Sequence, residues 1–327
     1  LLAIMKYILR HPPARQLPSD KKLWQWLLKV DTKCRSLFAA YLAEALRSQD
    51  ADAEDLSYES ILEHLYIREL KRWQAITGKD LVGPYTHLLY LVTLAGGCDE
   101  SVLDREDIRA LLPGNDYDST IYSELISTQP TQPERIAPLE PDIFGEYVLL
   151  RVSEDATKRG EKQALATLRG AGWRLPNAQV HDTLIRMQLD FGSRASAFID
   201  QCIKEADLAQ PETSQKLASV YRMIGLSRGI MHGDDRSALE AFTEAIRLQP
   251  DDPLPLFNQG MTLLKLKRLE EAASAFGAAI VRMPEFGRGW FTYGTVLREL
   301  GRHDESLAAF DKAIRFELDP HEAWFEK

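Results

Sequence analysis

Three stretches near the C-terminal end of the chain are versions of one another: ALEAFTEAIRLQP (238–250), AASAFGAAIVRMP (272–284) and SLAAFDKAIRFEL (306–318). Their phenylalanines, Phe242, Phe276 and Phe310, follow one another at intervals of 34 residues. Proline closes the first two copies, and in the third copy it comes two residues late, at Pro320. A repeat of this length predicts two antiparallel helices per copy, stacked into an α-solenoid.

The pattern resembles the tetratricopeptide repeat (TPR). Gly260 and Gly294 sit at matching positions ahead of the last two copies, where a small residue lets the paired helices approach closely. We expect the aromatic residue to fill the gap to the next repeat. The first copy is looser, because Gly225 falls one residue out of register. Three repeats are predicted over about 216–318, in a domain at 216–327 that ends inside a fourth opening helix and looks cut.

In tetratricopeptide proteins the first helices line a concave face that binds extended peptides or other protein surfaces. The resemblance implies a protein-binding groove formed by Leu254, Phe257, Met261, Leu264 and Lys265 from the second repeat, with Arg288, Phe291, Thr295, Arg298 and Glu299 from the third. Phe257 and Met261 replace the polar groups of the carboxylate clamp found in chaperone-binding members. An apolar groove rimmed by arginine suits a hydrophobic or acidic-hydrophobic partner. The alternative is that Leu254, Phe257 and Leu264 only pack within the solenoid.

The negative charge of the chain is concentrated in its middle. The 327 residues carry 40 basic and 49 acidic side chains, a net charge of −9. Residues 99–155 alone hold 4 basic and 14 acidic residues, which gives −10. An acidic run is usually a solvated face, and the alternative is a docking surface for a basic neighbour.

The same central region has the outline of a winged-helix domain. Helices are predicted at His87–Ala95, Ser101–Leu112 and Ser119–Ile126, and a short strand at Arg135–Leu139. Binding to DNA depends on Lys and Arg contacts to phosphate. The candidate recognition helix carries Glu124 and no basic residue, so we expect no DNA binding. This charge also disfavours a transcriptional regulator, a third reading of the chain.

Two motifs resemble segments of STAND NTPases, the NACHT and NB-ARC-like signalling ATPases. KCRSLFAAYL (33–42) is similar to the start of their helical subdomain, and PLEPDIFGEYVL (138–149) to the segment that closes their winged helix in bacterial members. RELKRW (68–73), LAGG (94–97) and GWRLP (172–176) fall in the expected order. Cys34 and Ser36 depart from the usual glycine and proline, and Pro141 stands where eukaryotic members have a phosphate-reading histidine.

The resemblance implies that this chain is the C-terminal, ligand-sensing part of such a protein. No G-x-x-x-x-G-K-[ST] motif is present, so we expect no enzymatic activity and no cofactor in this chain. ATP or ADP with Mg²⁺ would belong to an upstream ATPase core, from which partner binding would release the winged helix. Oligomerisation and a role in antiphage defence are further expectations. The alternative is a stand-alone TPR adaptor or scaffold protein.

The predicted fold class is mainly α: a helical subdomain at 1–79, a winged-helix-like domain at 80–152, helical linker repeats at 153–215 and the TPR solenoid. Residues 1–30 are either the end of an ATPase core, with Arg10 sensing nucleotide, or an amphipathic helix. The linker is predicted to hold helices at 155–169, 177–191 and 194–209. The three cysteines are widely spaced, no metal-binding motif occurs and no apolar run could span a membrane, so we predict a cytoplasmic protein.

Overall fold

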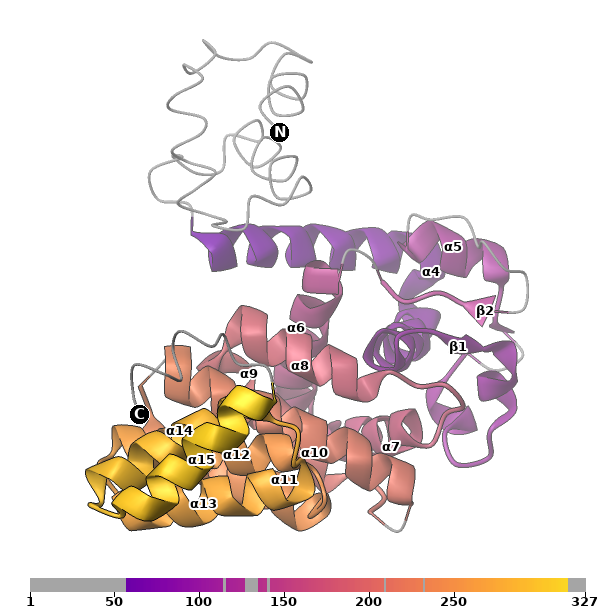
Figure 1. Cartoon of the computed structure of the whole chain (residues 1–327). Coiled ribbons are helices and arrows are strands. Elements are labelled where there is room, and N and C mark those ends of the chain that lie inside the picture. The colour runs from indigo at the N-terminus through magenta and orange to yellow at the C-terminus, as the bar shows by residue number, and fades with distance from the viewer. Residues whose placement is uncertain are drawn as a thin grey trace, which may run out of the picture. The chain divides into compact units, whose positions relative to one another are not determined.

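The computed structural model describes residues 57–113, 116–126, 135–139, 142–208, 210–231 and 233–316. The segment Leu1–Arg10, the KCRSLFAAYL motif, Pro141 and the opening of a fourth repeat lie outside these residues. The chain divides into two compact units, with the division between Ala171 and Gly172. The described residues of both units are mainly helical (Figure 1), so the predicted mainly α class is confirmed.

From residue 57 onward, the first unit contains one long helix, three shorter helices and a small two-stranded sheet. Its elements are α4 (Tyr58–Ala95), β1 (Cys98–Asp99), 3-10 turns at Glu100–Asp104 and Arg109–Leu111, α5 (Ser119–Ile126), β2 (Arg135–Ile136), α6 (Asp142–Arg159) and α7 (Lys162–Trp173). The two strands pair antiparallel, with Cys98 opposite Ile136. The strand predicted at 135–139 is therefore present over its first two residues.

Helix α4 consists of two helical segments joined at a kink. Its first turn is closed reciprocally, because Ser57 Oγ accepts the Ser60 N–H and Ser60 Oγ accepts the Ser57 N–H. Gly78 has φ 75° and ψ 175°, a backbone conformation that glycine adopts without steric cost. The break predicted near this residue is thus a kink, after which the chain re-enters the helix and continues through Pro84 to Ala95.

Side chains from α4 fix α5 at its C-terminal end. The carbonyl of Leu125 accepts hydrogen bonds from Trp73 Nε1 at 3.1 Å and from Arg72 Nη2 at 2.6 Å. Arg72 Nη1 also donates to the carbonyl of Glu124 at 2.6 Å. The last carbonyls of a helix have no partner inside the helix, so these donors complete α5 while Trp73 is buried in the core.

The helix predicted at Ser101–Leu112 is wrong, because two 3-10 turns replace it. The buried side chains of this segment are Val102, Leu103, Ile108 and Leu112. The five-residue step from Leu103 to Ile108 would put the two side chains on different faces of one α-helix. Breaking the segment into two turns lets all four reach the core.

Helix α6 packs closely against α4 at one glycine. A Cβ atom on Gly145 would lie 2.6 Å from the carbonyl oxygen of Leu139 and 2.9 Å from Thr93 Cγ2 of α4. Gly145 therefore has a packing role in the PLEPDIFGEYVL motif. The helix runs on to Arg159 and crosses the predicted boundary at 152/153. Gly160, with φ 79°, separates it from α7, so a single helix over 155–169 is a wrong prediction.

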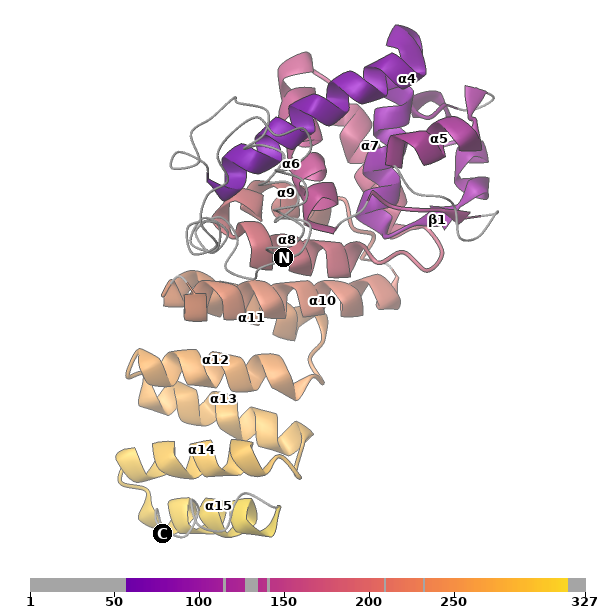
Figure 2. The same ribbon diagram turned by 90° about the horizontal axis from the view of Figure 1, so that it is seen from above.

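The second unit contains the solenoid. Its elements are α8 (Val180–Phe191), α9 (Ser193–Lys204), α10 (Pro211–Leu226), a π-helical turn (Ser227–Met231), α11 (Asp235–Leu248), α12 (Pro253–Lys265), α13 (Leu269–Arg282), α14 (Gly287–Glu299) and α15 (His303–Arg315). Helices α8 and α9 agree with the predictions at 177–191 and 194–209 within a few residues. Figure 2 shows α10 to α15 stacked in chain order, as expected for helix-pair repeats.

The aromatic residue of each repeat packs inside its own repeat. A Cβ atom on Gly260 would lie 2.8 Å from the ring of Phe276, and one on Gly294 would lie 2.9 Å from the ring of Phe310. Each ring thus fills the space left by the glycine of its own repeat. Phe276 also belongs to one core cluster with Val296 of the third repeat. A second link between these repeats runs through Phe257, whose ring centroid lies 4.9 Å from that of Phe286.

Candidate functional site

The predicted groove residues form matching stripes on α12 and α14. Leu254, Met261 and Leu264 of α12 occupy one side of the helix at intervals of seven and three residues. Their counterparts 34 residues later are Arg288, Thr295 and Arg298 of α14. The same repeat position is therefore apolar in the second repeat and mostly polar or basic in the third.

The exposure of the side chains separates surface residues from core residues. Leu254 and Met261 are each 40% exposed, which is high for apolar side chains of this size. Arg288 and Arg298 are also exposed, whereas Leu264 is half-buried against the core of the solenoid. The accessible part of the stripe thus consists of two apolar side chains and two guanidinium groups.

Phe257 belongs to the core of the solenoid. Its side chain is 8% exposed and contacts Phe276, with ring centroids 5.4 Å apart, as well as Phe286. Phe257 therefore packs within the solenoid, as the alternative prediction had it. Its prediction as a groove residue is wrong. Phe291 at the matching position is half-buried and packs on Phe310 at 5.7 Å.

Lys265 is engaged by the preceding repeat. Its ammonium nitrogen lies 2.7 Å from the carboxylate of Asp235 at the start of α11, and 3.4 Å from the carbonyl oxygen of Gly229. This ion pair ties the second repeat to the first, so the side chain serves the structure of the solenoid. Thr295 likewise hydrogen-bonds within its own helix, to the carbonyl of Phe291 at 3.1 Å.

A third stripe on α10 escaped the sequence analysis. A Cβ atom on Gly225 would lie 2.6 Å from the ring of Phe242, so this glycine is the structural equivalent of Gly260 and Gly294. Applying the offsets of Leu254, Met261 and Leu264 from Gly260 to Gly225 assigns Ser219, Leu226 and Gly229, all partly exposed, to the groove positions of the first repeat. Arg222 is the counterpart of the core residue Phe257. A strict interval of 34 residues would instead select residues that include the buried Val220 and Ser227.

The one-residue shift has a structural cause. Gly225 precedes Asp234, the N-cap of α11, by nine residues, whereas Gly260 precedes the equivalent Arg268 by eight. The π-helical turn Ser227–Met231 lies in this interval, and a π turn contains about one residue more than an α turn. The only hint in the sequence was the displaced glycine itself.

Neither a metal site nor a membrane-spanning helix is present in the described part of the chain. No group of three or more His, Cys, Asp or Glu side chains is arranged to hold a metal ion there. No described helix is both long and apolar enough to cross a membrane.

Comparison with known proteins gives a family for the C-terminal part. The family model of the tetratricopeptide repeat matches residues 232–286 and 257–323. No curated protein matches the chain.

Three of the solved structures that match the chain are each 17% identical to it. The match to MamA covers 50% of this chain and 94% of the MamA chain, with a TM-score of 0.33. YrrB is described as a TPR protein with an unusual peptide-binding site. The match to YrrB covers 68% of this chain and 97% of the YrrB chain, with a TM-score of 0.41. The match to the TPR2AB domain of yeast Sti1, solved in complex with pHSP90, covers 64% of this chain and 82% of the matched chain, with a TM-score of 0.31. The family match and the helix-pair architecture agree, and the region from 232 to 323 consists of tetratricopeptide repeats.

Proposed function

We propose that the solenoid binds an extended, acidic-hydrophobic segment of another protein along the first-helix stripes. The observation that carries the proposal is the pairing of exposed Leu254 and Met261 on α12 with two exposed arginines, Arg288 and Arg298, at stripe positions of the next first helix, α14. Leu254 and Met261 thus lie one repeat away from two guanidinium groups along the chain of first helices. Apolar side chains would give affinity, and guanidinium groups would select carboxylates that alternate with them.

The proposal is tested by selecting random peptides of about 15 residues for binding to the full chain. The affinity of a selected, labelled peptide is then measured by fluorescence polarisation. Met261→Glu places a negative charge in the middle of the stripe and should weaken binding at least tenfold. Val281→Glu is the matched control, because Val281 is 76% exposed on the second helix α13. Equal effects of the two variants, or peptides without acidic residues, would contradict the proposed surface.

At a finer level, we propose that the chain is the regulatory portion of a STAND-type signalling ATPase. The ordered motifs that resemble this family support it. Helix α5, the short strand β2 and α6 agree with the last part of the predicted winged-helix outline, whose middle helix is replaced by two 3-10 turns. In this proposal the chain itself is not an enzyme and acts in the cytoplasm. ATP or ADP and Mg²⁺ bind an upstream core, which oligomerises when the repeats capture a partner, for instance in antiphage defence.

The competing proposal is a stand-alone TPR adaptor, which the repeats support equally well. The natural coding sequence ahead of Leu1 discriminates between the two. A P-loop there would support the ATPase, and a start codon there would support the adaptor. Tight Mg²⁺-dependent binding of ATP by the present chain would contradict both proposals.

A further inference from the structure

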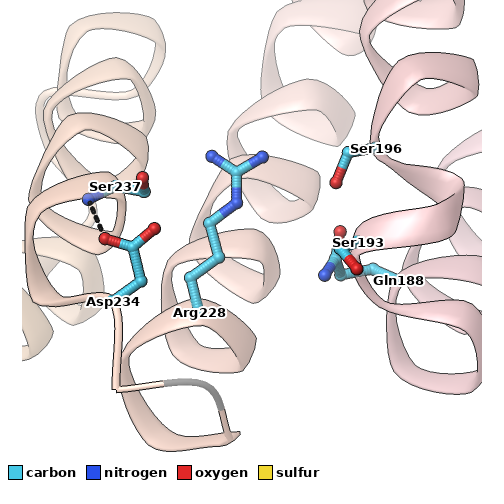
Figure 3. Close-up of a pocket in the computed structure, with 6 residues that line it drawn as sticks. All are labelled: Gln188, Ser193, Ser196, Arg228, Asp234 and Ser237. Carbon is cyan, nitrogen blue, oxygen red and sulfur yellow. Dashed lines mark hydrogen bonds between the residues drawn. The ribbon is translucent and has the colours of Figure 1, made fainter.

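A polar pocket lies beside the π-helical turn and shares no lining residue with the groove stripes. It has a volume of about 300 Å³ and is lined by Gln188, Ser193, Ser196, Arg228, Asp234 and Ser237. In Figure 3 the Arg228 guanidinium lies between the α11 residues on one side and Ser193 and Ser196 of α9 on the other. This volume is at the lower end of the range for small-molecule sites.

Gln188 brings an unsatisfied polar group to the pocket. Its side chain is 2% exposed, and its Nε2 donates to Ser227 Oγ at 3.2 Å. The amide oxygen, Oε1, is buried without a hydrogen-bond partner. Leaving a buried polar group unpaired is destabilising, and a ligand group that donates to this oxygen would remove the cost. A half-turn of the amide would present its nitrogen instead, so Gln188 can meet either an acceptor or a donor.

The start of α9 supplies hydrogen-bond donors. Gly192 is the only residue between α8 and α9, with φ 52° and ψ −123°, and it offers no side chain to cap α9. The first-turn N–H groups of α9 therefore lack a side-chain acceptor. Ser193 and Ser196 add two hydroxyls, neither of which hydrogen-bonds to another described side chain. A helix start of this kind favours an anion.

Arg228 provides the positive charge. No ion pair or hydrogen bond joins its guanidinium to any residue that the structure describes. Asp234, the acid of the pocket, is used at the start of α11, where Ser237 hydrogen-bonds to it through both hydroxyl and backbone N–H. These bonds, with a smaller contribution from the attraction of Arg228, lower the pKa of Asp234. The acid is thus occupied, while Arg228 still has guanidinium donors to offer.

The pocket coincides with the places where the first repeat departs from the other two. At the start of the second helix, the later repeats have the bidentate pairs Arg268–Glu271 and Arg302–Glu305, and the first has Asp234 and Ser237 instead. Three residues after the repeat glycine, the later repeats bury Leu263 and Leu297, and the first has Arg228. The π turn adds the extra residue between these two departures. All three changes exchange solenoid packing for a polar cavity.

We propose that this pocket binds the phosphate group of a small phosphorylated molecule. Arg228 forms the ion pair, the hydroxyls of Ser193 and Ser196 and the N–H groups of the first turn of α9 donate to the phosphate oxygens, and the amide of Gln188 holds the body of the ligand. Phosphate is favoured over carboxylate because it has three oxygens for this number of donors. The site is independent of the peptide groove and would make the first repeat a sensor of a metabolite.

The test uses the full chain with inorganic phosphate and O-phosphoserine as probes and acetate as the carboxylate comparison. Binding is measured by calorimetry and by the amide chemical shifts of Ser193 and Ser196. Arg228→Gln should weaken phosphate binding at least tenfold. The matched control is Arg236→Gln, because Arg236 is 92% exposed on α11 and carries the same charge close to the pocket.

Three results together would support the proposal. O-phosphoserine binds saturably and more tightly than inorganic phosphate, its binding shifts the amide signals of Ser193 and Ser196, and only Arg228→Gln abolishes this binding. The absence of saturation, equal losses in both variants, tighter binding of acetate, or shifts confined to the groove would overturn it. If Arg228→Gln does not fold, the wild-type chemical shifts and the acetate comparison still decide. Peptide binding to the groove is unaffected by either outcome, so the two proposals fail separately.

Discussion

Gly225 faces the ring of Phe242 as closely as Gly260 faces Phe276, although the first pair is separated by seventeen residues and the second by sixteen. A Cβ atom would come within 2.6 Å of the Phe242 ring and within 2.8 Å of the Phe276 ring. Both rings are almost fully buried. The contact between the two helices of a repeat is thus kept, and the backbone of the π turn absorbs the extra residue.

This equivalence predicts equal sensitivity to substitution. Gly225→Ala and Gly260→Ala should each destabilise the solenoid by about 1–3 kcal/mol, because the added methyl overpacks a buried ring. Gly277→Ala is the control, because its methyl would lie 3.8 Å from the nearest atom, in ordinary contact. It should be neutral or stabilising by up to about 1 kcal/mol. Urea unfolding followed by circular dichroism checks all three, and a neutral Gly225→Ala would contradict the assigned register.

Phe257 and Met261 should separate stability from binding. Phe257→Ala removes a ring that touches Phe276 and Phe286, so we expect a loss of about 3–5 kcal/mol in the free energy of unfolding. Met261→Ala alters a side chain that is 40% exposed and should cost far less, while it weakens binding of a selected peptide. Unfolding and polarisation measurements on both variants check this division. Loss of peptide binding in a fully stable Phe257→Ala variant would restore Phe257 to the groove.

The residues of the solenoid explain why its fold could be predicted and its pocket could not. The spacing of Phe242, Phe276 and Phe310 reflects a packing unit that recurs, so it is visible in the sequence. The π turn and the pocket arise where the recurrence fails, and a displaced Gly225 does not reveal which backbone conformation compensates. In the first unit, the irregular spacing of Leu103 and Ile108 indicates buried positions but not the two 3-10 turns that place them.

Lys267 is an exception to the glycine pattern of the repeat turns. It has φ 59°, whereas the residues at the same position in the first and third repeats are Gly233 and Gly301, with φ 65° and 74°. A left-handed conformation costs a residue other than glycine about 1–2 kcal/mol. Lys267→Gly should therefore stabilise the solenoid by up to about 1 kcal/mol after the greater chain entropy of glycine is subtracted. A lower midpoint in thermal unfolding would contradict this expectation.

Tyr85 anchors the segment before α5 in the first unit. Its hydroxyl donates to the carbonyl of Asp116 at 3.1 Å and accepts the N–H of Asp118 at 2.8 Å. Tyr85→Phe removes both bonds and should cost about 1–3 kcal/mol, with faster hydrogen exchange of the Asp118 amide. Tyr117→Phe is the control, because the Tyr117 ring lies in the same cluster and its hydroxyl makes no hydrogen bond with a described residue. Equal effects of the two variants would show that packing alone holds the segment.

The two Arg–Glu pairs predict how the solenoid responds to acid. Hydrogen bonds from Arg268 and Arg302 lower the pKa of Glu271 and Glu305, respectively. A carboxylate whose pKa is lowered by folding stabilises the folded state above its unfolded pKa of about 4.3 and loses that contribution as the pH falls through the folded value. The Glu271→Gln/Glu305→Gln variant should therefore lose less stability than the wild type between pH 6 and pH 3, by a modest amount because both pairs are exposed. The Arg268→Gln/Arg302→Gln variant should show the same flattening, since it removes the other half of each pair. An unchanged pH dependence in both variants would mean that the pairs add nothing measurable to the stability of the repeats.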